Sequence, residues 1–396
     1  MNHHLSRVLV CLLLLIGTSY SHAAEEMKEW NFLVYINGVN NLDSFGAQNI
    51  NQMEEVGSSD KMNILVQWGS AKNPNVTRLL VKKDSDKKNV TSPVVQNLGG
   101  ADMGDWKELV RFVEWSNQNY PAKHYFIVVW DHGSGWHIAK ANNTGTHIQD
   151  ISWDDRTGNY MTTEQLAQAM SESAKIIGHK VDIYASDACL MGMVEVASEM
   201  QTAVQYYVGS QDVEPGAGWP YNTFLSKWSS QIDSLSAKQV ATLLSKDYAA
   251  AYNGGIYGKR PVTMSAYDMS YISAYEQAFK KVGQELSNLN AADIAKANRA
   301  ASATKYFTNW DYRDSLDFLT QLEKNGVTAG SFADLRAAQN NFVMSNDQTQ
   351  DQKTWGVSVW LPTSSSDYDT YAQRYEGLKF HQNSGWGSFL KRLIKK

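Results

Sequence analysis

Cysteine is almost absent from this chain, which has two among its 396 residues. Cys11 lies in an apolar run near the N-terminus that we expect to be removed, which leaves Cys189 alone and without an internal disulfide partner. An exported protein gains little from one spare thiol, because that thiol can be oxidised. Cys189 is therefore either a small buried apolar side chain or a nucleophile, and the cysteine count does not choose between them.

The N-terminal residues predict export. Arg7 precedes an apolar run from Val8 to Ile16, and Ser21-His22-Ala23 fits the small-x-small pattern of a cleavage site. We expect a signal peptide over residues 1–23, because the apolar run is too short for a lasting membrane span. The mature protein would then be periplasmic or secreted and would have no membrane attachment.

The motifs of several other chemistries are missing. No long basic run is present and the formal net charge is −5, so neither nucleic acid nor an anionic membrane is an expected partner. Gly133-Ser134-Gly135 does not match the G-x-S-x-G motif of serine hydrolases, and no P-loop or dinucleotide fingerprint occurs. His132 and His137 flank the glycine-rich turn without a third ligand nearby, so no metal site is predicted.

Apolar runs alternate with helical patterns, which predicts an α/β fold with a parallel sheet. Strands are expected at residues 30–38, 62–69, 124–130, 181–185 and 203–211. Helices are expected at residues 43–57, 105–120, 162–178 and 190–200, the third opening with a capping box at Thr162-Thr163-Glu164-Gln165. A long polar loop is expected at residues 137–160.

This topology brings a histidine and the cysteine together. His132 lies two residues beyond the strand at 124–130, and Cys189 lies four residues beyond the strand at 181–185. Parallel strands end at one edge of their sheet, where open α/β sheets bind ligands, so we expect both residues on neighbouring loops. A nearby histidine can activate a thiol and move protons, which favours a nucleophilic role for Cys189. A histidine that only caps a turn is the alternative for His132.

Three further features surround this pair. Cys189 opens the segment at 190–200, whose helix dipole would stabilise a thiolate. Gly133 would let backbone N–H groups approach a substrate, and with the Cys189 N–H they could bind an oxyanion. Asp187 either caps the following helix or lines a pocket for a cationic side chain, and the residues alone leave both interpretations open.

Two blocks, VVWDHGSGW (128–136) and SDACLMGMVEVA (186–197), resemble the clostripain family of cysteine peptidases. The resemblance runs through most of the mature chain and includes VGSQDVEPGAGWPY (208–221). It implies a caspase-like three-layer sandwich, in which a mostly parallel sheet is flanked by helices, over residues 24–270. A mainly helical C-terminal subdomain is expected over residues 271–396.

The resemblance also implies roles for individual residues. His132 matches the family's catalytic histidine, Cys189 its nucleophile, and Gly133 the residue that joins the Cys189 amide in the oxyanion hole. Asp187 matches the acid at the floor of the S1 pocket, which implies cleavage after Arg or Lys. Some members use calcium, so calcium is implied only by resemblance, and no cofactor is otherwise expected.

Members of the resembled family are often made as zymogens that cut themselves between the histidine and the cysteine. Lys140 and Arg156 are the basic residues of the stretch 137–160, and both are candidate cleavage sites. Lys140 is favoured, because two acidic residues precede Arg156 and would be repelled by an acidic cleft. An intact, solvated loop is the alternative.

The sequence therefore predicts an exported cysteine endopeptidase that acts on proteins or peptides with Arg or Lys at P1. We expect a monomer, or two associated fragments after self-cleavage. A catalytically silent secreted binding protein on the same fold stays open as an alternative. The presence of both His132 and Cys189 argues against it, because a silent protein would be free to lose either residue. A transpeptidase or ligase, in which an amine replaces water, also stays open.

Overall fold

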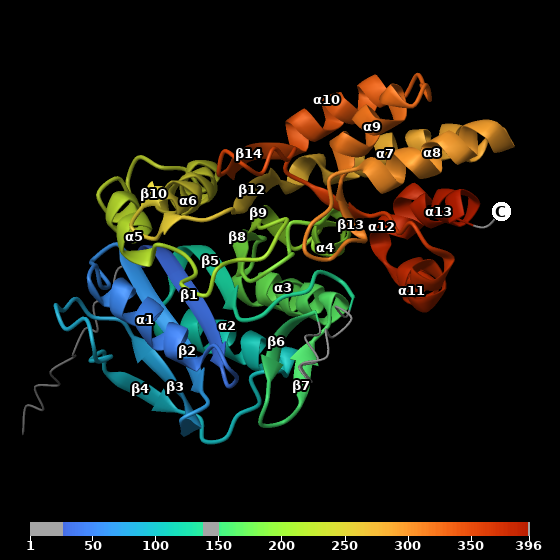
Figure 1. The fold of residues 1–396 in the computed structure, drawn as a ribbon. Helices are drawn as coiled ribbons and strands as arrows, with labels where there is room; N and C mark the ends of the chain where they lie inside the picture. Colours follow the sequence, from blue (N-terminus) through green and yellow to red (C-terminus); the bar gives the residue numbers. More distant parts are fainter. Residues whose placement is uncertain (1–26, 138–149, 395–396) are drawn as a thin grey trace, which may run out of the picture.

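A central sheet organises the chain in the computed structural model, which describes residues 27–137 and 150–394 (Figure 1). Its strands are β1 (Lys28–Gly38), β2 (Met62–Ser70), β3 (Asn73–Leu80), β4 (Val94–Asn97), β5 (Ala122–Trp130), β8 (Val181–Asp187), β9 (Val204–Gly209), β12 (Thr263–Asp268) and β14 (Val343–Gln348). These nine strands lie in the order β14-β12-β9-β8-β5-β1-β2-β3-β4.

The middle of the sheet is parallel. β2, β1, β5, β8 and β9 all run in one direction. At one end of the sheet β3 is antiparallel to β2 and β4 is antiparallel to β3, and at the other end β12 is antiparallel to β9 and β14 is antiparallel to β12. The parallel strands carry near-continuous apolar runs because both of their faces are buried, as in residues 125–130 of β5. All five strands predicted from the sequence are present.

Helices cover both faces of the sheet and form two separate cores (Figure 1). One face is covered by α1 (Asp43–Glu54), α5 (Tyr221–Ser229) and α6 (Ala237–Tyr252). The other is covered by α2 (Trp106–Asn119), α3 (Thr163–Ile177) and α4 (Val194–Glu199). This is the three-layer α/β sandwich that was predicted.

Local chemistry determines where α3 begins and ends. The Thr162 hydroxyl accepts a hydrogen bond from the Gln165 N–H at 3.1 Å, and Gln165 Oε1 accepts one from the Thr162 N–H at 3.0 Å. This is the predicted capping box, which satisfies two backbone donors that the helix leaves unpaired. The helix ends at Gly178, whose φ of 82° is costly for any residue with a Cβ.

Two predicted segments differ in the structure. The helix expected at 190–200 begins only at Val194, because Leu190 has a φ of 64° and residues 190–193 form an irregular turn. Part of the loop expected at 137–160 is instead a hairpin of β6 (Ile151–Asp154) and β7 (Asn159–Met161). The dipole of α4 therefore does not begin at Cys189, as the sequence had suggested.

The C-terminal part is mainly helical, as predicted. Its helices are α7 (Ile272–Ser287), α8 (Ala291–Ala303), α9 (Ser315–Lys324), α10 (Phe332–Phe342), α11 (Ser365–Gly377), α12 (Lys379–Ser384) and α13 (Trp386–Ile394). Within this part, β13 (Tyr312–Asp314) and β15 (Ser358–Trp360) form a small two-stranded sheet. Another two-stranded sheet, of β10 (Asn253–Gly255) and β11 (Gly258–Lys259), precedes this part in the chain.

This C-terminal part is tied to the rest of the chain through β14, which pairs with β12 and so completes the central sheet. The boundary expected after residue 270 stays a prediction. Across the described ranges, no helix combines the length and the apolar character that a bilayer span requires.

Candidate active site

The candidate site lies where β5 and β8 end. Trp130 pairs with Asp187 in the parallel register of these strands, so both strands reach the same edge at the same height. His132 lies two residues beyond Trp130, and Cys189 lies two residues beyond Asp187. The histidine and the cysteine therefore leave the sheet on neighbouring loops, and the cysteine leaves two residues nearer to its strand than the sequence had indicated.

The two loops touch at Gly133. A Cβ atom built on Gly133 would lie 2.5 Å from the Cys189 carbonyl oxygen and 3.2 Å from the Cys189 backbone nitrogen. Non-bonded atoms do not approach so closely, so any side chain at position 133 would force the loops apart. This contact keeps the backbone amides of both loops beside the cysteine.

The Cys189 thiol is partly buried and surrounded by acidic groups. The backbone N–H of Glu214 points at Sγ from 3.3 Å. Burial raises the pKa of the thiol to about 12, and the charges of Glu214, Asp212 and Asp187 add to the effect. Cys189 is therefore a neutral thiol at physiological pH in this conformation.

His132 is neutral as well. Burial lowers its pKa below 6.5, and the charge of Asp155 opposes that shift only in part. Its Nε2 atom lies 2.6 Å from Asn41 Oδ1. Because that oxygen can only accept, Nε2 carries the proton and Nδ1 is left as a proton acceptor. No hydrogen bond joins His132 to Cys189 among the described side chains.

Asp187 is buried close to Cys189 in the chain and does not cap a helix. The N-cap residue of α4 is Met193, which makes no side-chain capping bond. The Asp187 carboxylate instead accepts a hydrogen bond from the Tyr221 hydroxyl at 2.7 Å. Gly218, with a φ of 62°, crosses over it so closely that an added Cβ would lie 3.1 Å from Oδ2.

A second buried carboxyl group lies next to Asp187. Glu214 accepts a hydrogen bond from Trp219 Nε1 at 3.1 Å and is buried next to Asp187. Burial raises the pKa of Asp187 to about 7, and burial followed by the charge of Asp187 raises that of Glu214 well above its usual value. No ion pair within the described residues joins either carboxyl to a basic side chain. Both buried carboxyl groups therefore lack a cationic partner within the part of the chain that the structure describes.

Two residues near the pair, Asn41 and Glu214, were not predicted from the sequence. Asn41 follows β1, which runs parallel to β5, so the edge rule that located His132 also applied to it. Glu214 follows β9 by the same rule. The position of both residues after a parallel strand was therefore visible in the sequence. Polar residues are common in such loops, however, and the residue type does not reveal which of them face the site.

The structure describes only one of the two candidate cleavage sites. Arg156 lies at the tip of the β6–β7 hairpin, and its guanidinium donates hydrogen bonds to the carbonyl oxygens of Ser70, Asn73 and Pro74. Its side chain is thus already bound within the fold. Lys140 lies outside the described residues.

Within residues 27–137 and 150–394, no group of three or more His, Cys, Asp or Glu side chains is arranged to hold a metal ion.

Comparison with known proteins gives one decisive match. The family model described as Clostripain family matches residues 34–392. The chain belongs to the clostripain family. It is 24% identical to clostripain of Hathewaya histolytica over 316 residues, which cover 68% of this chain and 59% of clostripain. The chain thus spans about three fifths of the length of that curated relative.

Solved structures of the clostripain family support the same fold. A secreted C11 cysteine protease from Bacteroides thetaiotaomicron, in complex with an irreversible peptide inhibitor, has a TM-score of 0.70 and 21% identity, covering 91% of this chain and 99% of its own. An inactive zymogen C11 protease from Parabacteroides distasonis has a TM-score of 0.68 and 16% identity, covering 90% of this chain and 98% of its own. The predicted caspase-like fold and the family resemblance are both confirmed.

The contact between the two loops can be tested through stability. Gly133→Ala should lower the free energy of unfolding by about 1–3 kcal/mol, because its methyl group would press on the Cys189 backbone. Gly100→Ala is the matched control, since its new methyl would meet only one atom, at 3.9 Å. Urea denaturation measures both variants. Equal stabilities for Gly133→Ala and wild type would show that the loops do not touch.

Proposed function

We propose that this protein is a cysteine endopeptidase that cleaves after Arg or Lys, with Cys189 as nucleophile and His132 as general base and acid. One observation carries the proposal: in a chain of the clostripain family, both side chains leave the same sheet edge on loops that touch at Gly133. Membership of the family supports protein or peptide substrates. The residue assignments and the specificity are our inference from the geometry.

The reaction begins from a neutral pair. His132 turns to the thiol and takes its proton on Nδ1 as Sγ bonds to the scissile carbonyl carbon. The other ring proton stays on Nε2, and Asn41 Oδ1 accepts its hydrogen bond and stabilises the imidazolium that forms. The N–H groups of Gly133 and Cys189 receive the negative charge of the carbonyl oxygen.

The second half of the reaction returns both groups to their starting state. The imidazolium gives its proton to the leaving amine as the C–N bond breaks, which leaves a thioester on Cys189. His132 then takes a proton from water, the resulting hydroxide attacks the thioester, and the proton returns to the thiolate as the acid departs. Every step uses side chains of this chain, so we propose that no cofactor is required, and assays with and without a chelator test a need for calcium.

The pocket of Asp187 and Glu214 accounts for the proposed specificity. Two buried carboxyl groups are costly to ionise unless a cation pairs with them, and the long cationic side chain of Arg or Lys at P1 supplies one. The side chain would enter beside Cys189, because Asp187 is two residues from it along the chain.

Export and activation extend the proposal. The Bacteroides relative is described as secreted and the Parabacteroides relative as a zymogen. By similarity we propose that this chain is exported, to the periplasm or beyond the cell, and that it is made as a precursor. Self-cleavage at Lys140 fits better than at Arg156, because the Arg156 side chain is held by three backbone carbonyls.

Removing either member of the pair should abolish turnover of a fluorogenic Arg peptide. Cys189→Ala removes the nucleophile, and His132→Ala should lose nearly as much activity because the two groups act as a unit. The activity of the double variant should be no lower than that of the less active single variant. Residual activity above about a tenth of wild type in Cys189→Ala would rule out the assignment, since loss of a nucleophile costs several orders of magnitude.

The pocket predicts a pH dependence with a definite sign. Asp187 attracts a cation only when ionised, and burial raises its pKa to about 7, so kcat/KM for an Arg substrate should rise as pH increases through about 7. Asp187→Asn should lower that value roughly tens- to thousands-fold, the equivalent of about 2–5 kcal/mol. A citrulline substrate, which has no charge, should be affected far less. Equal losses for both substrates would contradict a charge-pairing role.

Self-cleavage can be read directly by mass spectrometry. Wild type should separate under denaturing conditions into two fragments divided at Lys140, whereas Cys189→Ala should remain whole. Lys140→Gln should prevent the cut, and Arg156→Gln is the matched control that should not. A fully active wild type that is not cut would rule out activation by self-cleavage. A cut that persists in Cys189→Ala would show that another protease makes it.

A further inference from the structure

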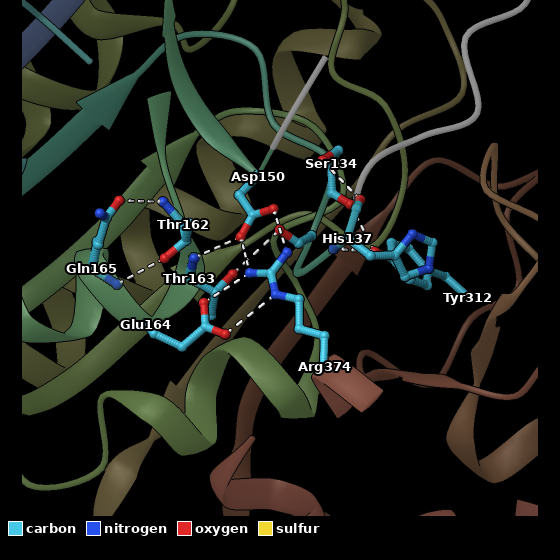
Figure 2. Close-up of polar contacts among 10 residues, drawn as sticks. Ser134, His137, Asp150, Thr162, Thr163, Glu164, Gln165, Tyr312 and Arg374 are labelled. Atoms are coloured by element: carbon cyan, nitrogen blue, oxygen red, sulfur yellow. Dashed lines mark hydrogen bonds and ion pairs between the residues drawn. The ribbon is translucent and has the colours of Figure 1, made fainter. Parts of the chain in front are cut away.

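One arginine of the C-terminal part reaches the turn that follows His132. Arg374, on α11, donates hydrogen bonds from Nη1 to Asp150 Oδ1 at 3.0 Å and from Nη2 to Asp150 Oδ2 (Figure 2). It also holds Glu164 through Nε at 3.2 Å and Nη2 at 2.7 Å. This planar, two-sided pairing is specific to a guanidinium, because a lysine ammonium cannot present parallel donors to two carboxylates.

Asp150 is the centre of the network. Its side chain is 0% exposed, and its Oδ2 also accepts a hydrogen bond from the Thr163 N–H at 2.7 Å, at the start of α3. Figure 2 shows the carboxylate between Arg374 and the α3 terminus. Because an unpaired carboxylate is costly to bury, the position of Asp150 depends on Arg374.

Asp150 in turn holds the turn that follows His132. The Ser134 N–H donates to the Asp150 carbonyl oxygen at 2.8 Å, and Gly133 bridges to the next residue, Ile151. Arg374 itself lies over the Trp136 ring, with its guanidinium carbon 5.9 Å from the ring centroid. The arginine thus contacts the turn at residues 133–137 both directly and through Asp150.

A second residue of the C-terminal part holds the same turn from another side. The Tyr312 hydroxyl donates to the Ser134 carbonyl oxygen at 2.8 Å and accepts from the His137 N–H at 3.2 Å. Gly135, with a φ of 70°, leaves room for this ring, since an added Cβ would lie 2.7 Å from it. The turn is therefore enclosed by the C-terminal part on one side and by Asp150 on the other.

We propose that Arg374 is a positioning residue for catalysis: by locking Asp150, it fixes the turn that places His132 and Gly133 against Cys189. The inference rests on the proposed function, because it assigns Arg374 to the geometry of that site. Arg374 touches no reacting atom, so its loss should lower the rate of the chemical step more than substrate binding.

The chain offers a closely matched control. Arg336 pairs with Glu323 at 2.9 Å in the same C-terminal part, and its side chain is 31% exposed against 30% for Arg374. The difference lies in the partners, because the Glu323 side chain is 44% exposed whereas that of Asp150 is fully buried. Arg336→Ala therefore removes an arginine ion pair of similar exposure without disturbing the turn.

Kinetics provide the first test. Arg374→Ala should lower kcat for a fluorogenic Arg peptide at least about tenfold and leave KM within about threefold, because misplacement costs mainly rate. Arg374→Lys keeps the charge, so its kcat should lie between those of wild type and Arg374→Ala. Millimolar guanidinium should restore part of the kcat of Arg374→Ala. Arg336→Ala should keep wild-type kcat and gain nothing from guanidinium. All assays are run well below the unfolding temperature of each variant.

Hydrogen exchange provides a second test that needs no activity. In the Cys189→Ala background, which cannot cut itself, adding Arg374→Lys should speed amide exchange in peptides that cover residues 132–137. Adding Arg336→Ala should leave those peptides unchanged. This comparison uses the conservative lysine variant, so it does not depend on Arg374→Ala folding.

The outcomes separate the two proposals. If wild type shows no turnover that depends on Cys189, the proposed function is wrong and the positioning role of Arg374 is wrong as well. If wild type is active but Arg374→Ala and Arg374→Lys keep full kcat, only the positioning role is overturned. Equal losses of kcat in Arg374→Ala and Arg336→Ala would make Arg374 a merely structural residue. The same conclusion would follow if Arg374→Ala lost kcat without guanidinium rescue and Arg374→Lys showed no faster exchange at residues 132–137.

Discussion

The parallel register of β5 against β8 is the constraint on which the site depends. It pairs Trp130 with Asp187, so the loops that follow begin level with each other and meet at Gly133. A slip of one residue would turn every side chain of β8 to the opposite face of the sheet. Asp187 would then lose its buried pocket, and Cys189 its place against the histidine loop. The apolar runs of both strands, buried on each face, make such a slip costly.

Burial at this edge shifts the ionisable groups of the site toward their neutral forms. It raises the pKa of Cys189 to about 12 and that of Asp187 to about 7, and it lowers that of His132. At neutral pH the thiol and the imidazole are therefore uncharged, and Asp187 is near the midpoint of its ionisation. A cationic side chain entering beside Cys189 would ionise the pocket carboxyl groups, so substrate binding and the charge state of the site are linked.

The sequence predicted the parts of this site that follow from apolar runs and topology. The five parallel strands, the capping box of α3 and the shared edge of His132 and Cys189 depend on local patterns. The late start of α4 does not, because residues 190–193 are held by distant contacts such as the Gly192 N–H to the Ser210 carbonyl. Arg374 is separated from Asp150 by 224 positions and has no local signature. Pairings of that kind become visible only in three dimensions.

The distance along the chain between Arg374 and the turn it contacts has a consequence for biosynthesis. A ribosome makes the histidine and the cysteine when less than half of the chain is complete, but Tyr312 and Arg374, which contact the turn at 133–137 from the C-terminal part, are made much later. The newly made chain therefore contains His132 and Cys189 before the contacts that the C-terminal part makes with this turn can form. Completing the last fifth of the chain would then assemble the site, so a proteolytic chain would be least able to attack its neighbours while it is still being made.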